Sequence, residues 1–170
     1  MATRPILEPV YPDAIRPSVF QDGLEFQDFV CELLAKQGII LQNLTSKKWQ
    51  VKLGENLQGF EIKYDSRCSE TGRLSIEVAE KSRASQELAW TRSGIMRSDN
   101  SWLYIQGNYA ILFLFAKRFL LNYYYAINPE LTDKFGTIRT FYLPIQAARK
   151  HAARVIDLSS GRAPAYGVGA

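Results

Sequence analysis

Carboxylates and lysines alternate with apolar residues in two short segments near the middle of the chain. The first segment carries Glu61 and Lys63, and the second carries Glu77 and Lys81. Side chains alternate between the two faces of a β-strand, so these charged residues share one face. Residues 66–72 are rich in turn formers, which predicts an antiparallel β-hairpin. In that hairpin Glu61 would lie opposite Glu77, within reach of one divalent cation, although a solvent-exposed face with cross-strand Glu–Lys pairs gives the same pattern.

The chain has few other side chains that bind metals. Two cysteines, Cys31 and Cys68, and a single histidine, His151, cannot make a zinc site of cysteine and histidine ligands. We expect Cys31 to pack in the core rather than to act as a nucleophile with His151, and we expect no structural disulfide. Carboxylate oxygens remain as ligands, and they favour Mg²⁺ or Mn²⁺.

Composition is typical of a soluble globular domain. The chain has 170 residues, of which 46% are hydrophobic and 22% are charged, enough for one domain with a core. Its most apolar stretch, 109–126, contains Lys117, Arg118 and Asn122, which argues against a membrane helix. Residues 1–5 lack the pattern of a secretory signal peptide, so we expect a cytoplasmic protein with no membrane segment.

Arginines follow directly after the second acidic segment, and the net charge is +4. A polyanion whose scissile phosphate meets the metal would place its neighbouring phosphates against such cations. We therefore predict that Arg83, Arg92 and Arg97 contact nucleic acid. A second basic group, Arg149, Lys150 and Arg154, falls on a predicted late helix and is expected to be a solubilising face.

Sequence signals divide the chain into three parts. Residues 1–21 contain four prolines and predict an extended arm, residues 22–158 predict one domain, and residues 159–170 predict a flexible tail. Within the domain, periodicity and turn residues predict a helix from an Asp22 N-cap to Gly38, strands at 39–44 and 49–53, and then the hairpin. A short helix at 82–90, a loop at 92–100 and strands at 102–106 and 110–115 are expected to follow. The last predicted elements are a helix at 117–127, a strand at 137–143 and a helix at 145–158.

This order of elements over residues 22–115, with acids on the central hairpin, resembles the PD-(D/E)XK nuclease superfamily. The resemblance implies an α/β (α+β) fold with a restriction-endonuclease-like core of order αβββαβ, in which helices flank a central mixed β-sheet. In that family, one acid on the second core strand and the acid of a D/E-x-K signature on the third bind the metal, while the lysine orients or activates water. Here 59–62 fits the first element and 76–79 fits the second, with Ala79 at the lysine position.

The alanine leaves two alignments open. In the first, Glu61 and Glu77 bind the metal, and Lys81 or Lys63 supplies the ammonium group. In the second, Glu61-Ile62-Lys63 is itself the D/E-x-K element, with Glu55 as the earlier acid. We prefer the first alignment with Lys81, because it uses Glu77 and keeps the lysine on the same strand and face.

Two further groups each allow two interpretations. Glu25, near the start of the first helix, resembles the additional acid that some family members carry there, and a capping box with Asp22 explains it equally well. The run 123–125 of three tyrosines could stack unpaired bases together with Phe119, whereas aromatic runs more often belong to a core.

We therefore predict a Mg²⁺- or Mn²⁺-dependent nuclease that hydrolyses phosphodiester bonds in DNA. Glu61 and Glu77 would be the metal ligands, with Lys81, Lys63 and Glu25 completing the site. The missing signature lysine leaves open a catalytically inactive nuclease-fold module that binds nucleic acid or a protein partner. A third class is a structural protein whose proline-rich arm mediates assembly. The resemblance also implies a homodimer, because small nucleases of this type often act as dimers.

Overall fold

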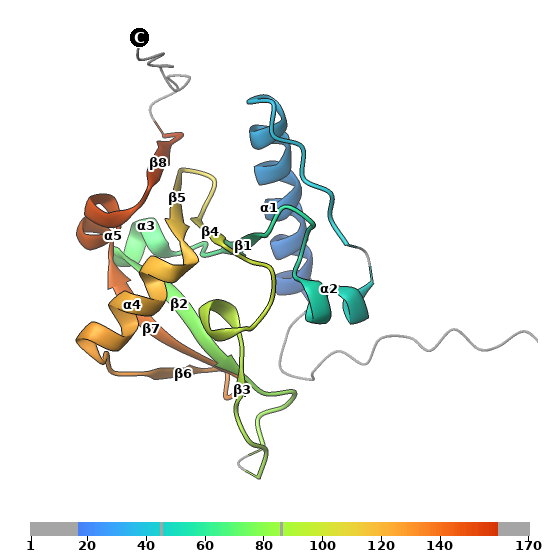
Figure 1. Ribbon diagram of the computed structural model, residues 1–170. Coiled ribbons are helices and arrows are strands. Elements are labelled where there is room, and N and C mark those ends of the chain that lie inside the picture. Colours follow the sequence, from blue (N-terminus) through green and yellow to red (C-terminus); the bar gives the residue numbers. More distant parts are fainter. Residues whose placement is uncertain (1–16, 45, 86, 160–170) are drawn as a thin grey trace, which may run out of the picture.

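Two four-stranded β-sheets and five α-helices make up the computed structural model, which describes residues 17–44, 46–85 and 87–159 (Figure 1). The helices are α1 (Pro17–Ala35), α2 (Lys47–Leu53), α3 (Cys68–Thr71), α4 (Lys117–Ile127), α5 (Ile145–His151) and the 3-10 helix η1 (Gly94–Met96). The strands are β1 (Phe60–Tyr64), β2 (Arg73–Glu80), β3 (Thr91–Arg92), β4 (Leu103–Gly107), β5 (Ile111–Ala116), β6 (Thr132–Lys134), β7 (Ile138–Pro144) and β8 (Arg154–Asp157). The predicted mixed α/β class is confirmed.

The first sheet is mixed and has the strand order β1-β4-β5-β8, with β1 parallel to β4 and the other pairs antiparallel. Helix α1 covers one face of this sheet, on the right in Figure 1. Its apolar side chains recur at helical spacing, so Phe26, Val30 and Leu34 meet the sheet together and pack with Ile62 and Ile105. The helix predicted for this segment from periodicity is thus confirmed.

The second sheet is antiparallel, with the order β3-β2-β7-β6. The main core lies between the two sheets, where Leu74 and Ile76 of β2 and Phe141 of β7 pack with Tyr104 and Phe113 of the first sheet. Helices α4 and α5 close this core on the side away from α1 (Figure 1). The first sheet therefore has one face on α1 and the other on the second sheet.

The predicted hairpin between Glu61 and Lys81 is wrong, because its two arms belong to different sheets. Strand β1 pairs with β4 and strand β2 pairs with β7. The expected turn contains helix α3, whose Cys68 side chain is buried, and the chain leaves this helix through Gly72 at a φ of 67°. Alternation with period 2 is the same whichever partner a strand has, so the predicted apolar faces of Ile62 on β1 and of Leu74, Ile76 and Val78 on β2 are correct although the pairing is not. A register shift between Glu77 and Ala79 interrupts the alternation of β2 towards its end.

Several other predicted elements also differ. Residues 39–44 form a loop with a single bridge from Asn43 to Asn56, and residues 49–53 belong to helix α2, because short apolar runs fit a helix as well as a strand. Residues 82–85 and 87–90 form bends, a turn and irregular segments rather than the predicted helix. The last helix ends at His151, and the β-branched residues that follow form β8, which pairs with β5.

Three further predictions concern the ends of the domain. Helix α1 begins at Pro17, so Asp22 lies inside the helix and the capping box with Glu25 is wrong. Of the predicted arm and tail, residues 1–16 and 160–170 lie outside the described part of the chain.

The remaining predicted strands and the helix at 117–127 agree with β4, β5, β7 and α4. No described helix is long and apolar enough to span a bilayer.

Removing the Phe26 side chain should destabilise the folded protein, because the ring is fully buried and stacks on Tyr64 at a centroid distance of 4.7 Å. We expect Phe26→Ala to lower the free energy of unfolding by about 3–5 kcal/mol in urea denaturation. Leu24→Ala is the matched control on the same helix, with a side chain that is 42% exposed. Equal effects of the two substitutions would contradict the packing of α1 on the first sheet.

Candidate active site

Three charged side chains meet at strand β1 and the loop before it. Lys63 Nζ lies 3.0 Å from Glu61 Oε1 and 3.2 Å from Glu55 Oε1. The other oxygen of Glu55 accepts a hydrogen bond from the backbone N–H of Ile62 at 3.0 Å. The Glu61 side chain is only 1% exposed, whereas Glu55 and Lys63 are 19% and 25% exposed. We call Glu55, Glu61 and Lys63 the β1 charge cluster.

The loop that carries Glu55 is fixed by side-chain amide groups. Asn56 is fully buried, and its side chain bonds both the N–H and the carbonyl of Phe60, the first residue of β1. Asn100 donates from its side-chain amide to the carbonyl oxygen of Asn56 at 2.9 Å. Glu55 is therefore held against β1 by hydrogen bonds from two directions.

Lys63 is the permanent cation of this cluster. Burial alone would lower the pKa of Lys63, but Glu55, Glu61 and Glu77 outweigh burial and hold the pKa well above its usual 10.5. The ammonium group is therefore charged at neutral pH. It can stabilise negative charge, and it is a poor general base.

Glu61 carries buried oxygens without hydrogen-bond partners. Neither of its carboxylate oxygens accepts a hydrogen bond from any described residue, despite the nearby Lys63 ammonium. Tyr104, its partner in the β1–β4 register, has a buried hydroxyl that is likewise without a partner among the described residues. Burial raises the pKa of Tyr104, and Glu61 raises it further. Buried polar atoms almost always have partners, so these oxygens mark a place suited to a further ligand.

Glu77 of β2 and Arg97 extend the cluster from the second sheet. Burial alone would lower the pKa of Arg97, but Glu61, Glu80 and Glu77 together raise it, and Arg97 Nη2 lies 3.3 Å from Glu80 Oε1. Helix η1 packs directly on Glu77, since a Cβ atom at Gly94 would collide with the Glu77 carbonyl oxygen. Glu61 and Glu77 thus act on the same cations although their strands are not paired.

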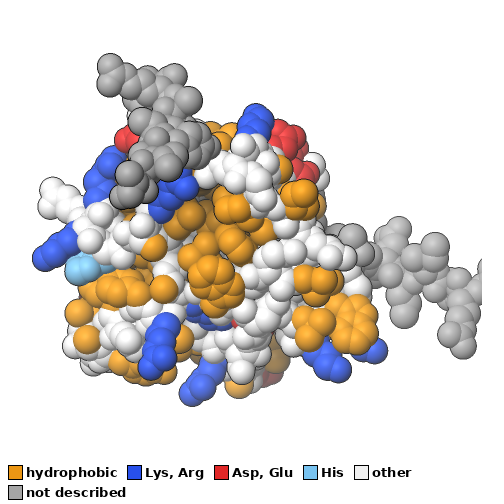
Figure 2. All heavy atoms as spheres, turned by 45° about the horizontal axis from the view of Figure 1, so that its top comes forward, with side chains coloured by type: hydrophobic (Ala, Val, Ile, Leu, Met, Phe, Trp, Pro, Cys, Tyr) orange, Lys and Arg blue, Asp and Glu red, His pale blue; other side chains and the backbone are white. Residues whose placement is uncertain are grey.

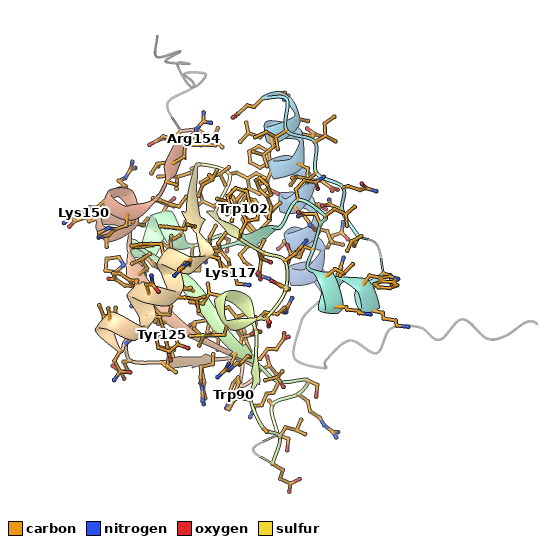
Figure 3. All side chains as sticks on the ribbon, in the orientation of Figure 1. Trp90, Trp102, Lys117, Tyr125, Lys150 and Arg154 are labelled. Atoms are coloured by element: carbon orange, nitrogen blue, oxygen red, sulfur yellow. The ribbon has the colours of Figure 1, made fainter. Side chains whose placement is uncertain are left out.

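A second buried ion pair fixes the segment that carries Arg97. Lys117, at the start of α4, donates to Asp99 Oδ1 at 2.9 Å and to the carbonyl oxygen of Arg97 at 2.8 Å. The two paired side chains are 6% and 1% exposed, and Lys117 lies in the middle of the molecule (Figure 3). Burial would raise the pKa of Asp99, but the hydrogen bonds from Lys117 and Ser101 hold it below its usual value.

The other predicted site residues lie elsewhere. Lys81 Nζ donates to the Ser85 carbonyl at 2.8 Å and lies 4.8 Å from the Trp90 ring centroid, so it is engaged beyond the end of β2. Glu25 is exposed on α1, where it accepts a hydrogen bond from Gln21. Of the predicted residues, the structure brings Glu61 and Lys63 into direct contact, and the charges of Glu77 and Arg97 act on the same groups. It does not bring Lys81 or Glu25 to them.

The predicted nucleic-acid contacts are spread over the surface. Arg83 and Arg92 are exposed, whereas Arg97 is largely buried. On the face shown in Figure 2, Lys and Arg side chains are scattered around hydrophobic and uncharged groups. Lys150 and Arg154 point outward at the edge of the molecule, as expected for a solubilising group (Figure 3).

Sequence reasoning missed three members of the site. Tyr104, Asp99 and Lys117 are distant from the Glu-x-Lys segment in sequence, and only the strand pairing and the loop path bring them to it. The aromatic run 123–125 packs partly against the main core through Tyr123 and Tyr124 rather than forming an open stacking surface.

The oxygens of Glu61 fit a hard divalent cation such as Mg²⁺. They are buried and accept no hydrogen bond from the described residues, and a second carboxylate, Glu77, acts on the same groups. Across the described residues, no group of three or more Asp, Glu, His or Cys side chains is arranged to hold a metal ion. A cation bound by Glu61 would therefore depend on water or substrate for most of its ligands.

Comparison with known proteins gave no match to a family model, to a curated protein or to a solved structure.

Breaking the Asp99–Lys117 pair from one side should destabilise the protein. We expect Lys117→Met to lower the free energy of unfolding by about 3–5 kcal/mol, because it leaves a buried carboxylate unpaired, and Lys117→Met with Asp99→Leu to recover most of the loss. Because the pKa of Asp99 is depressed, the stabilisation is present above pH 3.8 and is lost as the pH falls through the folded-state pKa. Urea denaturation between pH 7 and pH 2.5 measures both effects, and a double variant no more stable than Lys117→Met would contradict the pairing.

Proposed function

We propose that this protein is a metal-dependent nuclease that hydrolyses phosphodiester bonds in DNA. One observation carries the proposal: the Lys63 ammonium lies within 3.2 Å of two carboxylates, and the oxygens of the buried one, Glu61, accept no hydrogen bond from the described residues. Such a site combines hard oxygen ligands with a fixed positive charge. Both are required where a phosphodiester gains negative charge in its transition state.

In this proposal, the acidic residues would bind the metal and the basic residues would stabilise the phosphate. A Mg²⁺ ion held by Glu61, with Glu55 or Glu77 as the second carboxylate, would offset phosphate charge and lower the pKa of the attacking water. Lys63 stays protonated, so it would stabilise the developing charge electrostatically and orient the phosphate. Glu55 holds the Lys63 ammonium in place. Arg97, whose own charge is favoured by Glu61 and Glu77, would add a second positive group at the same place.

The geometry favours the second alignment with the PD-(D/E)XK superfamily. In that alignment Glu61-Ile62-Lys63 is the D/E-x-K element and Glu55 is the earlier acid, and these three charged groups are in contact. Ala79 then needs no replacement lysine. A mixed sheet with α1 on one face also supports a restriction-endonuclease-like core as part of this proposal.

A catalytically inactive binding module is the second candidate. The observation that favours it is the short distance of 3.0 Å between Lys63 Nζ and Glu61 Oε1, since a divalent cation at Glu61 would have to share the carboxylate with the ammonium group. Metal binding separates the two candidates. A nuclease must bind Mg²⁺ or Mn²⁺ through Glu61, and an inactive module has no such requirement.

The purified protein should cleave plasmid DNA with Mg²⁺ or Mn²⁺ and should not cleave it in excess EDTA. We expect Glu61→Gln to abolish cleavage and to weaken Mn²⁺ binding in isothermal titration calorimetry. The variant should remain folded, because the substitution preserves the shape of the side chain and removes a buried charge. Cleavage that persists in EDTA, or in Glu61→Gln, would exclude the proposed metal site.

The two candidate lysines should differ sharply in their effect on cleavage. We expect Lys63→Met to lower the single-turnover cleavage rate by about two orders of magnitude, the scale for losing one preorganised electrostatic contact. Lys81→Met is the matched control, because it removes a lysine that is bound to Ser85, and we expect a rate within about threefold of wild type. A large loss in Lys81→Met with little change in Lys63→Met would restore the first alignment.

A further inference from the structure

The turn between β6 and β7 presents an aromatic side chain in an unfavourable backbone conformation. Phe135 and Gly136 follow Lys134, whose carbonyl accepts a hydrogen bond from the N–H of Thr137 at 3.1 Å. Both central residues of this turn have positive φ, 53° for Phe135 and 67° for Gly136. Such turns favour Asn, Asp or Gly, and a bulky residue in the left-handed region is an outlier. Phe135 is nevertheless 72% exposed, so core packing does not explain it.

The tip of this turn is braced by the segment that follows β2. A Cβ atom at Gly136 would lie 2.9 Å from Ala84 Cβ, and the N–H of Lys81 donates to the Thr137 carbonyl at 2.9 Å. The tip lies at the lower end of the molecule in Figure 1, close to the place where Figure 3 labels Trp90. Phe135 therefore projects from a supported turn rather than from a free loop.

Basic residues are near Phe135 in the chain and in the segment that braces its turn. Lys134 directly precedes Phe135, and the bracing segment 81–85 contains Lys81 and Arg83 between Glu80 and Glu87. The acid nearest in sequence on β6, Asp133, is paired with Arg139 at 2.7 Å. A strained, exposed aromatic ring among cations fits a ligand that has both phosphates and flat stacking surfaces.

We propose that Phe135 stacks on or inserts between bases of the DNA bound at the candidate active site; this inference rests on the proposed function. Strand β2 links the two places, because Glu77 and Lys81 are four residues apart, a span of roughly 13 Å along a strand. That span corresponds to about four base-pair steps of a duplex. Apolar wedges that unstack a base step are a known way for proteins to kink and grip DNA. The charged neighbours and the single exposed ring fit DNA better than a lipid surface, which binds through a broader apolar face.

Substituting Phe135 by Asn should separate stability from function. Asn suits the left-handed turn, so we expect Phe135→Asn to raise the melting temperature by about 2–4 °C. We also expect it to weaken binding to a 30-base-pair duplex about tenfold, the scale of losing one base–aromatic stack. The wild type should increase the fluorescence of 2-aminopurine placed in the duplex, because this base brightens on unstacking, and Phe135→Asn should not. Phe135→Gly should behave like Phe135→Asn, and Phe135→Trp should retain binding.

Tyr125→Ala is the control, since it removes a 65% exposed aromatic from α4, away from the turn. The inference is overturned if wild type cleaves DNA and Phe135→Asn matches it in affinity and in fluorescence change. It is also overturned if Phe135→Asn loses affinity only for phosphatidylserine vesicles. A wild-type protein that neither binds nor cleaves DNA would instead refute the proposed function, and the inference with it.

Discussion

Burial of the Glu61 carboxylate is the constraint on which the rest of the site depends. An ionised carboxylate in a protein interior is unfavourable by several kcal/mol unless it is paired, and Lys63 on the same face of β1 provides the partner at 3.0 Å. Lys63 in turn is held by Glu55, whose loop is tied to β1 through Asn56. The parallel pairing of β1 with β4 adds Tyr104 beside Glu61. Lys63, the Glu55 loop and Tyr104 thus all lie around one buried carboxylate.

The charges around Glu61 do not cancel, and the imbalance determines which kind of ion the site would attract. Glu55, Glu61 and Glu77 act on Lys63, and Glu61, Glu80, Glu77 and Asp99 act on Arg97, so more carboxylates than cations surround Glu61. The cluster therefore keeps a surplus of negative charge that would favour a further cation. Arg97 is positioned indirectly, because the buried Asp99–Lys117 pair holds its backbone carbonyl. Two buried ion pairs thus have different roles: the Glu61–Lys63 pair forms the candidate site, and the Asp99–Lys117 pair fixes the segment that carries Arg97.

Features set by residues close together in the sequence could be predicted, whereas features set by residues far apart in the sequence could not. Alternation correctly assigned Ile62 to one face of β1, and Glu61 with Lys63 to the other, because a strand fixes the direction of its own side chains. It could not identify the partner strand, since the period is the same in any sheet. Tyr104 and Lys117 reach the site only through pairing and loop geometry, which depend on contacts distant in sequence. Helix α4 was predictable because its limits follow from local signals.

The structure does not bring Lys81 to the β1 charge cluster, for a related reason that shows where local rules remain informative. A lysine on the strand of Glu77 was expected to reach back over Ala79, but Lys81 is drawn instead to the Ser85 carbonyl and the Trp90 ring, partners that its strand position did not reveal. Natural sequences obey local rules almost everywhere, so a violation marks a place where something else is selected. A buried carboxylate at Glu61 that accepts no hydrogen bond from the described residues and a phenylalanine at positive φ at position 135 are two such violations. The turn that carries Phe135 is braced by the segment after β2, the strand that carries Glu77, and one ligand reaching from Glu61 along that strand would account for both violations.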